Sequence, residues 1–477
     1  MSQPDTQPPK AADVKAKASA ENEETLYAVR QKVYPRAVTG VFAKWRWILV
    51  WATQLIFYGL CWLPWNDRQA VLLDVVNRKF YIFDWIFWPQ DVFFLAILLI
   101  ISAYSLFFFT AVAGRLWCGY ACPQTVYTEI FMWIEEKIEG NRSQRMKLDE
   151  APMSGRKFAI KAAKFGSWGL LSLWTGFTLV GYFTPIRELV HEALTFSFGP
   201  WELFWIFFYG GFTYLFAGVM REQVCKYMCP YARFQGVMFD PDTLVITYDP
   251  ERGEPRGPRK KGIDLKVAGK GDCVDCGICV QVCPTGIDIR DGLQYECINC
   301  GACVDACDQT MERMGYPKGL ISYTTEHKLA HSETQVARPK LIGYGLVMVV
   351  MLGVFVYNAM SIMPMGLDIL RDRNQLFREN SEGLIENTYT LKILNKTLNS
   401  QTYRLDVEGL PEYQWFGPRE VTLKAGEIYT LPVSLAVDPF NLKRPTLDVQ
   451  FVLKREGAAP DDSKGTLRQP SKFISRL

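Results

Sequence analysis

Five long runs of residues without a charged side chain constrain the fold more than any other feature of this sequence. About 20 apolar residues in a helix cross the ~30 Å hydrocarbon layer of a membrane, and buried helices of soluble proteins are seldom so long and so free of charge. We therefore predict an α-helical membrane bundle with five spans. The runs are Trp47–Trp65, Val92–Gly114, Phe165–Ile186, Leu203–Met220 and Leu341–Leu367.

The distribution of Lys and Arg among the loops orients these predicted spans. Residues 115–164 hold nine basic side chains, whereas residues 66–91 hold three and residues 187–202 hold one. Cytoplasmic loops carry the excess of positive charge, so we place the N-terminus and the 115–164 loop in the cytoplasm. Alternation then predicts that the long 221–340 segment is cytoplasmic and that the chain after the fifth span lies on the other side.

Soluble parts must flank the spans, because a mean hydropathy of −0.01 is too polar for a chain that lies in the membrane throughout. Residues 1–29 are poor in large apolar side chains and are predicted to be disordered, without the pattern of a signal peptide. Residues 368–477 alternate apolar and polar side chains between turn residues, which is typical of an antiparallel β-sandwich. The predicted strands include 389–395, 402–407, 428–434 and 447–453.

Eight of the 13 cysteines lie between the fourth and fifth spans and give the strongest chemical signal. They follow the pattern C-x₂-C-x₂-C-x₃-C twice, the spacing of two-cluster ferredoxins, in which the fourth cysteine of each motif serves the other cluster. Zinc sites use four ligands rather than eight, and disulfides are disfavoured in the cytoplasm. We predict one [4Fe–4S] cluster on Cys273, Cys276, Cys279 and Cys307, and a second on Cys297, Cys300, Cys303 and Cys283.

Three residues beside these cysteines bear on the prediction of two clusters. Gly277 and Gly301 follow the second cysteine of each motif, where the chain must turn tightly around a cluster. Asp308 follows Cys307, at the position where a proline would complete the bacterial pattern. Because Asp308 lies beyond the last ligand, this departure leaves the predicted ligation intact.

Four further cysteines form an internal repeat. Cys118 and Cys122 follow the second span, and Cys225 and Cys229 follow the fourth, each pair in a C-x₃-C-P motif. Residues four apart on a helix share a face, so each pair is expected to present both thiols together, and stacked hairpins would gather four thiols at one membrane surface. Copper, another cluster or no metal at all remain open, and soft thiolates favour Cu(I) among the metal ions.

The other candidate residues are less specific. Cys61 lies within the first span and is expected to be a packing residue. The spans contain no histidine, which excludes paired histidine ligands for a transmembrane haem. His327 and His331 are four residues apart and are expected on a solvated face rather than as a ligand pair. The formal charge of only +3 argues against nucleic-acid binding.

These features together resemble the CcoG family (also called FixG and RdxA), accessory proteins of the cbb3-type cytochrome oxidase. The twin C-x₃-C-P motifs, the two-cluster insert, the exported tail and the 248–256 stretch carry the resemblance. It implies four helices in two hairpins over 30–238, a linker and ferredoxin-like insert over 239–340, a fifth span over 341–367 and a periplasmic immunoglobulin-like domain over 368–477.

The resemblance further implies a cupric reductase of the bacterial inner membrane, which reduces Cu(II) to Cu(I) for the copper centre of the oxidase. Its implied partners are copper ions, a copper chaperone, the oxidase subunits, membrane lipid and a cytoplasmic electron donor. Cys118, Cys122, Cys225 and Cys229 would correspond to the thiols associated with copper reduction and copper binding. The eight ferredoxin cysteines would correspond to the cluster ligands.

Two other functions fit the same residues. One is a quinol dehydrogenase that feeds a respiratory reductase, and it would show quinol-dependent bleaching of the clusters. The other is a non-enzymatic iron–sulfur sensor or assembly scaffold, which would show no steady turnover of Cu(II).

Overall fold

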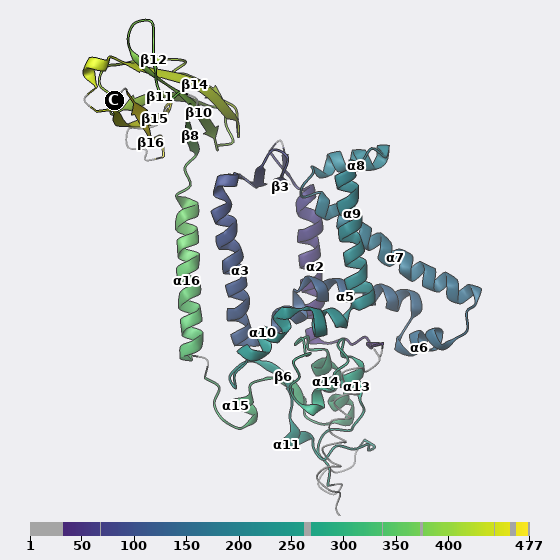
Figure 1. The fold of residues 1–477 in the computed structure, drawn as a ribbon. Helices are drawn as coiled ribbons and strands as arrows, with labels where there is room; N and C mark the ends of the chain where they lie inside the picture. The colour runs from purple at the N-terminus through teal and green to yellow at the C-terminus, as the bar shows by residue number, and fades with distance from the viewer. Residues whose placement is uncertain are drawn as a thin grey trace, which may run out of the picture. The chain divides into compact units, whose positions relative to one another are not determined.

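The computed structural model describes residues 32–475, apart from 67, 262–268, 336, 373–374, 443 and 458–463. The predicted disorder of residues 1–29 falls outside the described residues. The chain divides into two compact units, each assembled from segments that are distant in the sequence (Figure 1). Among the described residues, unit 1 takes in 32–51, 109–171 and 212–335, and unit 2 takes in 52–108, 172–211 and 337–475, with the gaps given above.

Three helices in the described part of the chain are long and apolar enough to cross a membrane. They are α3 (Val92–Ala113), α9 (Pro200–Thr213) with its π-helical continuation to Met220, and α16 (Pro339–Met360). They coincide with the second, fourth and fifth predicted spans. The first and third runs lie mostly in α2 (Val41–Gly59) and α7 (Gly155–Val180), and their crossing of a membrane stays a prediction.

The fifth apolar run ends in an element that hydropathy did not predict. The sequence predicts one span over Leu341–Leu367, but α16 ends at Met360 and strand β8 (Met365–Arg371) begins shortly after it. Met365 and Leu367 are buried in the core of the C-terminal domain. A lipid-facing helix and a buried strand are equally apolar, so hydropathy alone places this boundary several residues too late.

Unit 1 combines short helices around the C-x₃-C-P motifs with the ferredoxin-like module. The helices are α4 (Leu116–Tyr120), α5 (Pro123–Glu139), α6 (Arg142–Glu150), the π-helical turn η4 (Val224–Met228) and α10 (Pro230–Met238). In the module, β6 (Val245–Tyr248) pairs antiparallel with β7 (Ile321–Thr324), and α13 (Ile278–Gln281) packs near α14 (Ala302–Met314).

The ferredoxin-like module is fixed to the start of α2. The Asp305 carboxylate of α14 accepts hydrogen bonds from the backbone N–H groups of Phe42 (3.3 Å) and Ala43 (2.8 Å). It thereby satisfies two of the four donors that a helix leaves unpaired at its N-terminus. The backbone N–H of Arg36 also donates to the Gln281 carbonyl at 2.8 Å. The first helix and the insert are therefore joined by specific polar contacts.

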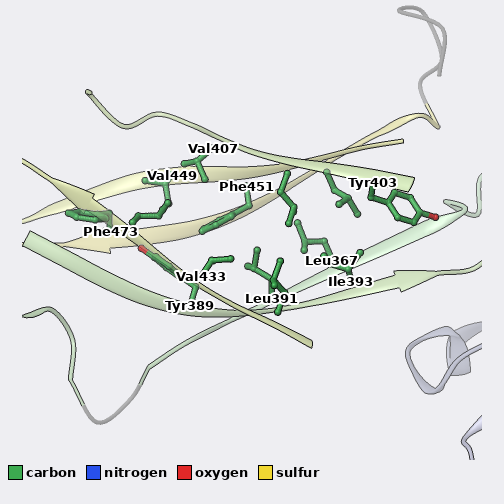
Figure 2. Close-up of a cluster of buried hydrophobic side chains, with 14 of the residues drawn as sticks. Leu367, Tyr389, Leu391, Ile393, Tyr403, Val407, Val433, Val449, Phe451 and Phe473 are labelled. Atoms are coloured by element: carbon green, nitrogen blue, oxygen red, sulfur yellow. The ribbon is translucent and has the colours of Figure 1, made fainter. Parts of the chain in front are cut away.

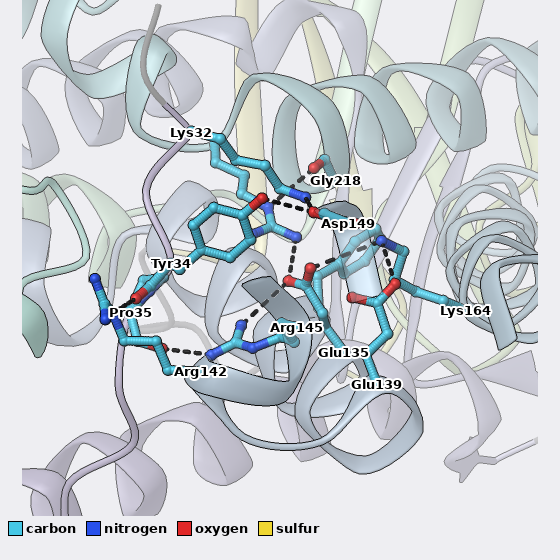
Figure 3. A network of polar contacts seen from close by, with 12 residues as sticks. Lys32, Tyr34, Pro35, Glu135, Glu139, Arg142, Arg145, Asp149, Lys164 and Gly218 are labelled. Atoms are coloured by element: carbon cyan, nitrogen blue, oxygen red, sulfur yellow. Dashed lines mark hydrogen bonds and ion pairs between the residues drawn. The ribbon is translucent and has the colours of Figure 1, made fainter. Parts of the chain in front are cut away.

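A buried network of charges joins α5, α6 and α7 (Figure 3). The fully buried Glu135 carboxylate lies 2.5 Å from the Arg221 guanidinium, 3.6 Å from that of Arg145 and 3.7 Å from the Lys164 ammonium. Burial raises the pKa of Glu135, but Arg221 and Lys164 outweigh this effect and hold the pKa below its usual value. Glu135 is therefore ionised, and it compensates several cations that have been removed from water.

We expect Glu135→Gln to lower the stability of this region by about 3–5 kcal/mol, because it leaves buried cations without their counter-charge. Glu136→Gln, on the same helix but partly exposed and outside this network, is the matched control and should change stability by less than about 0.5 kcal/mol. Hydrogen exchange of the α5 amides measures the difference. Equal protection in the two variants would contradict this role for Glu135.

Unit 2 contains small sheets and a β-sandwich. One small sheet pairs β1 (Pro64–Trp65) with β2 (Arg68–Gln69). The other is an antiparallel meander of β3 (Val71–Asp74), β4 (Lys79–Ile82) and β5 (Trp85–Phe87). Helix α8 (Ile186–Thr195) belongs to the same unit. The sandwich strands are β8, β9 (Arg378–Glu379), β10 (Ile385–Asn395), β11 (Gln401–Glu408), β12 (Tyr413–Phe416), β13 (Glu420–Leu423), β14 (Ile428–Val437), β15 (Thr446–Arg455) and β16 (Thr466–Ile474).

The two sheets of the sandwich face each other across one apolar core (Figure 2). Their strand orders are β12-β14-β10-β8, with β9 also paired to β10, and β13-β11-β15-β16, and every pairing is antiparallel. Tyr389 of the first sheet meets Phe451 of the second edge to face, with ring centroids 5.0 Å apart. The predicted antiparallel sandwich is confirmed, and the four predicted strands lie within β10, β11, β14 and β15.

Candidate metal centres

Two cavities in the ferredoxin-like module are lined by cysteines, and both are partly open to solvent. One, of about 360 Å³ with its open part included, is lined by the four cysteines Cys273, Cys276, Cys279 and Cys307. The other, of about 340 Å³ with its open part included, is lined by Cys283, Cys297, Cys300 and Cys303, and Cys279 is a fifth cysteine on its wall. Apart from this fifth cysteine, each cavity takes three cysteines from one motif and the fourth from the other motif. This is the distribution that the sequence predicts for two [4Fe–4S] clusters.

The backbone around both cavities repeats the same left-handed turns. Asp275 and Gly277 flank Cys276 with φ of 51° and 62°, and Asn299 and Gly301 flank Cys300 with φ of 52° and 74°. The glycines were predicted at such turns. Asp275 and Asn299 were not, although Asp and Asn adopt this conformation more readily than other side chains do. Their position directly before the second cysteine of each motif was the available signal.

The cysteine side chains are mostly withdrawn from water, and this affects their acidity. Burial raises the pKa of Cys307 and of Cys297 to about 12, and it raises the pKa of Cys303 well above its usual value. Without metal these thiols are protonated at neutral pH, and metal binding must release their protons. Several sulfur donors around a largely apolar cavity are the donor set that iron–sulfur clusters use.

The structure gives a reason for Asp308. Helix α14 continues from Ala302 to Met314, so Asp308 lies in its interior and its carboxylate accepts a hydrogen bond from the Gly319 backbone N–H at 2.9 Å. A proline at this position would remove a backbone donor and clash with the preceding turn. The helix α13 of the first motif instead ends at Gln281, before Cys283 and Pro284.

The C-x₃-C-P motifs do not lie on one helix face as predicted. Cys118 belongs to α4, which ends at Tyr120, and Cys122 is the extended residue that precedes α5. Cys225 belongs to η4, and Cys229 is the extended residue that precedes α10. The proline that follows the second cysteine disfavours the helical conformation for the residue before it. Each motif is therefore a short helical turn, a break at the second cysteine and a new helix that begins with proline.

The four thiols of the two motifs nevertheless lie close enough to influence one another. Burial, with a smaller contribution from Cys122, raises the pKa of Cys118 to about 12, and Cys229 adds to this effect. Burial and the neighbouring thiols of Cys122 and Cys118 likewise raise the pKa of Cys225 to about 12. We call these four cysteines the thiol quartet. Among the described residues, no three Cys, His, Asp or Glu side chains, including those of the quartet and of the ferredoxin motifs, lie in positions that could hold a metal ion.

Two glutamines, which sequence reasoning missed, connect the repeats to each other. Gln235 of α10, in the second repeat, is fully buried and accepts from the Cys118 thiol of the first repeat, with Sγ and Oε1 3.4 Å apart. Gln124 of α5, in the first repeat, donates to the backbone carbonyls of Phe216 (2.9 Å) and Arg221 (3.2 Å) near the second motif. An uncharged polar residue soon after each C-x₃-C-P was the available signal.

The thiol quartet and the second ferredoxin cavity are neighbours. Gly119, next to Cys118, packs so tightly that an added Cβ would lie 2.6 Å from the Ile298 carbonyl oxygen and 2.9 Å from Cys300 Cα. A further cavity of about 380 Å³ has Cys225 on its lining together with Ile298 and Cys300. A metal ion held by the quartet would therefore lie beside the cysteines of the second cavity.

The remaining candidates have ordinary structural surroundings. Cys61 is 1% exposed and belongs to an apolar cluster with Val180 and Ile206, as expected for a packing residue. His327 Nδ1 lies 2.7 Å from an Asp242 carboxylate oxygen, and His331 Nε2 lies 2.9 Å from a Glu251 carboxylate oxygen. The two histidines thus have separate partners and do not form a ligand pair.

Three family models match different parts of the chain. A model described as a 4Fe–4S dicluster domain matches residues 220–326, and one described as a 4Fe–4S binding domain matches residues 95–141. A third, described as the Ig-like fold at the C-terminal of FixG, matches residues 355–476. The first two matches include the four cysteines of the thiol quartet and the eight ferredoxin cysteines, and Cys61 lies outside both.

Relatives of known name extend the similarity over most of the chain. The nitrogen fixation protein FixG of Rhizobium meliloti (strain 1021) is 37% identical over 424 residues, which cover 81% of this chain and 81% of FixG. Protein RdxA of Cereibacter sphaeroides is 41% identical over 404 residues, which cover 81% of this chain and 84% of RdxA. The chain belongs to the FixG and RdxA family.

Two other similarities are confined to part of the chain. The ferredoxin-type protein NapH of Haemophilus influenzae is 28% identical over 208 residues, which cover 39% of this chain and 66% of NapH. A crystal structure of a FixG-related protein from Vibrio parahaemolyticus is 40% identical and matches 24% of this chain and all of its own, with a TM-score of 0.22. The family and the 4Fe–4S domains make this chain an iron–sulfur electron-transfer protein with an oxidoreductase role.

Proposed function

We propose that this protein reduces Cu(II) to Cu(I) at the thiol quartet and supplies the Cu(I) for the copper centre of a cbb3-type cytochrome oxidase. The observation that carries the proposal is that one cysteine of each repeat lies beside the second ferredoxin cavity: Cys118 packs against Ile298 and Cys300, and Cys225 lines a cavity together with Cys300. The reaction consumes one electron for each copper ion. Soft thiolate ligands stabilise the reduced ion over the oxidised one.

The ferredoxin cysteines have a separate role in this proposal. Cys273, Cys276, Cys279 and Cys307 would hold one [4Fe–4S] cluster, and Cys283, Cys297, Cys300 and Cys303 would hold the other. Such clusters, when bound, exchange single electrons at low potential. The two cavities share Cys279 on their walls, which supports their use as neighbouring sites.

The setting that we propose is the inner membrane of a bacterium. The five apolar runs would span it, the ferredoxin-like module and the thiol quartet would face the cytoplasm, and the Ig-like domain would lie in the periplasm. The charge bias of the loops supports this orientation. A cytoplasmic electron donor, a copper chaperone and the oxidase subunits would be its partners.

The test is the double variant Cys118→Ala/Cys122→Ala in the full-length protein. We expect it to keep its iron and sulfide content and to lose nearly all Cu(II) reduction, measured by a Cu(I)-specific chromogenic chelator with a chemical reductant. Cys61→Ala, at a buried cysteine outside the quartet, is the matched control and should reduce Cu(II) at the wild-type rate.

Full Cu(II) reduction by the double variant with both clusters intact would contradict the assignment of the quartet. Bleaching of the clusters by quinol in membranes, without turnover of Cu(II), would favour the quinol dehydrogenase instead. A protein that shows neither reaction would be a scaffold or a sensor.

A further inference from the structure

Arg115 is a buried cation in an unusual position between α3 and α4. Its side chain belongs to a residue that is only 2% exposed, and one terminal nitrogen donates to the Ala232 carbonyl while the other donates to the Tyr295 carbonyl. Its Nε is buried and has no hydrogen-bond partner among the described residues. The guanidinium thus joins the chain just after the second C-x₃-C-P motif to the chain just before Cys297.

No carboxylate compensates this charge in the described part of the chain. The other buried arginines of unit 1 have one: Arg46 pairs with Glu129, and Arg145 and Arg221 both pair with Glu135. A buried ion without a counter-charge costs several kcal/mol. Neutral carbonyl acceptors offset only a part of that cost. A negative charge near Arg115 would therefore stabilise its buried guanidinium.

The groups near Arg115 that can become anions are cysteines of two different sites. Arg115 lies three residues before Cys118, and its guanidinium binds the carbonyl of Ala232, three residues after Cys229, and that of Tyr295, two residues before Cys297. The electrostatic influence of Cys118, Cys225, Cys229 and Cys297 on the pKa of Arg115 agrees with this placement. Burial lowers the pKa of Arg115, and these thiols act in the opposite direction. When metal is bound the thiols are thiolates, and both sites then present negative charge to the same guanidinium.

We propose that Arg115 is the shared counter-charge of the thiol quartet and of the cluster in the second cavity, and that it couples the two sites electrostatically. It is a positioning residue, because it stabilises the ligands of both sites without binding metal itself. Its charge favours thiolates in the quartet and favours the reduced, more negative state of the neighbouring cluster. The part that concerns copper rests on the proposed function, whereas the part that concerns the cluster does not.

The experiment compares Arg115→Gln, Arg115→Lys and Arg46→Gln in the full-length protein. Arg46 is the matched control, because the cysteine among the groups with the largest influence on its pKa is Cys300 of the second cavity, and because Glu129 is its own counter-charge. Two quantities are measured: the midpoint potentials of the clusters, by dye-mediated titration with electron paramagnetic resonance, and the Cu(I) dissociation constant, by competition with a chromogenic chelator. Iron content confirms that each variant has assembled.

We expect Arg115→Gln to shift one cluster to a more negative midpoint potential and to weaken Cu(I) binding by about tenfold or more. Arg115→Lys keeps the charge and should restore both values to near wild type. Arg46→Gln should shift the potential and leave Cu(I) affinity unchanged. This combination separates a shared counter-charge from a charge that acts on one site only.

Wild-type values for both quantities in an iron-replete Arg115→Gln variant would overturn the proposal. Equal effects of Arg115→Lys and Arg115→Gln would also overturn it, because the hydrogen bonds rather than the charge would then be responsible. If Arg115→Gln does not assemble its clusters, the comparison is between assembly of the two variants: failure of Arg115→Lys to assemble as well would overturn the proposal. A loss of Cu(I) affinity in Arg46→Gln as large as in Arg115→Gln would also overturn it. If the wild type binds no Cu(I), the proposed function fails, and the potential alone decides the role of Arg115.

Discussion

The double variant Cys273→Ala/Cys307→Ala is expected to lose one [4Fe–4S] cluster and to keep the other, although its two cysteines belong to different motifs. Both line the 360 Å³ cavity, and neither lines the 340 Å³ cavity. If both cysteines are ligands of the same cluster, the first substitution already causes the loss of that cluster, and the second substitution causes no further loss of iron. Iron and sulfide content should therefore fall to half, as in either single variant.

The matched control for this experiment is Cys273→Ala/Cys283→Ala. These two cysteines lie in the same motif, ten residues apart in the sequence, but they line different cavities. We expect this variant to lose both clusters and nearly all of its iron. The two double variants remove the same number of thiols, so a difference in iron content reports only how the ligands are shared.

The opposite result for the two double variants would contradict the assignment in which each cluster takes its fourth cysteine from the other motif. If each motif held its own cluster, the control would keep half of its iron and Cys273→Ala/Cys307→Ala would lose all of it. Electron paramagnetic resonance of the dithionite-reduced protein provides the second measurement. A single uncoupled signal is expected from the variant that keeps one cluster, whereas two neighbouring reduced clusters interact and broaden each other's signals.

The spacing of the eight cysteines predicts two groups of four, each with three cysteines from one motif and the fourth from the other. The same groups of cysteines line the two cavities, and their ligation of clusters stays a prediction. The β-sandwich was also predictable, since alternation of apolar and polar side chains marked β10, β11, β14 and β15. The other strands carry a weaker signal of alternation; β16, for example, is mostly partly exposed and contains Pro470.

The geometry of the C-x₃-C-P motifs was predicted wrongly, although the signal for it is local. Spacing alone placed Cys118 and Cys122 on one helix face, but the proline after Cys122 disfavours a helical conformation of Cys122, and α4 ends at Tyr120. Features that depend on long-range packing were not predictable. Arg115 counted only as one of nine basic loop residues, because nothing in the sequence indicates that residues 232 and 295 fold against it.

The packing of Gly119 against the second cavity leads to the other large expected effect. We expect Gly119→Ala to lower the rate of Cu(II) reduction by about tenfold or more, while the cluster in the 360 Å³ cavity keeps its signal. The added methyl group would lie 2.6 Å from the Ile298 carbonyl oxygen and 2.9 Å from both the Asn299 carbonyl oxygen and Cys300 Cα. All three atoms are backbone, so no side chain can rotate away.

Gly236→Ala is the matched control, because Gly236 lies on α10 of the same unit and the nearest atom to an added Cβ is Tyr295 Cβ at 3.9 Å, an ordinary contact. It should reduce Cu(II) at the wild-type rate. Overpacking of this kind costs about 1–3 kcal/mol, which α4 relieves by moving away from the loop that carries Asn299 and Cys300. That movement would separate Cys118 from the second cavity and slow electron delivery to the thiol quartet. Unchanged Cu(II) turnover and unchanged spectra in Gly119→Ala would show that this contact does not determine the rate of electron delivery.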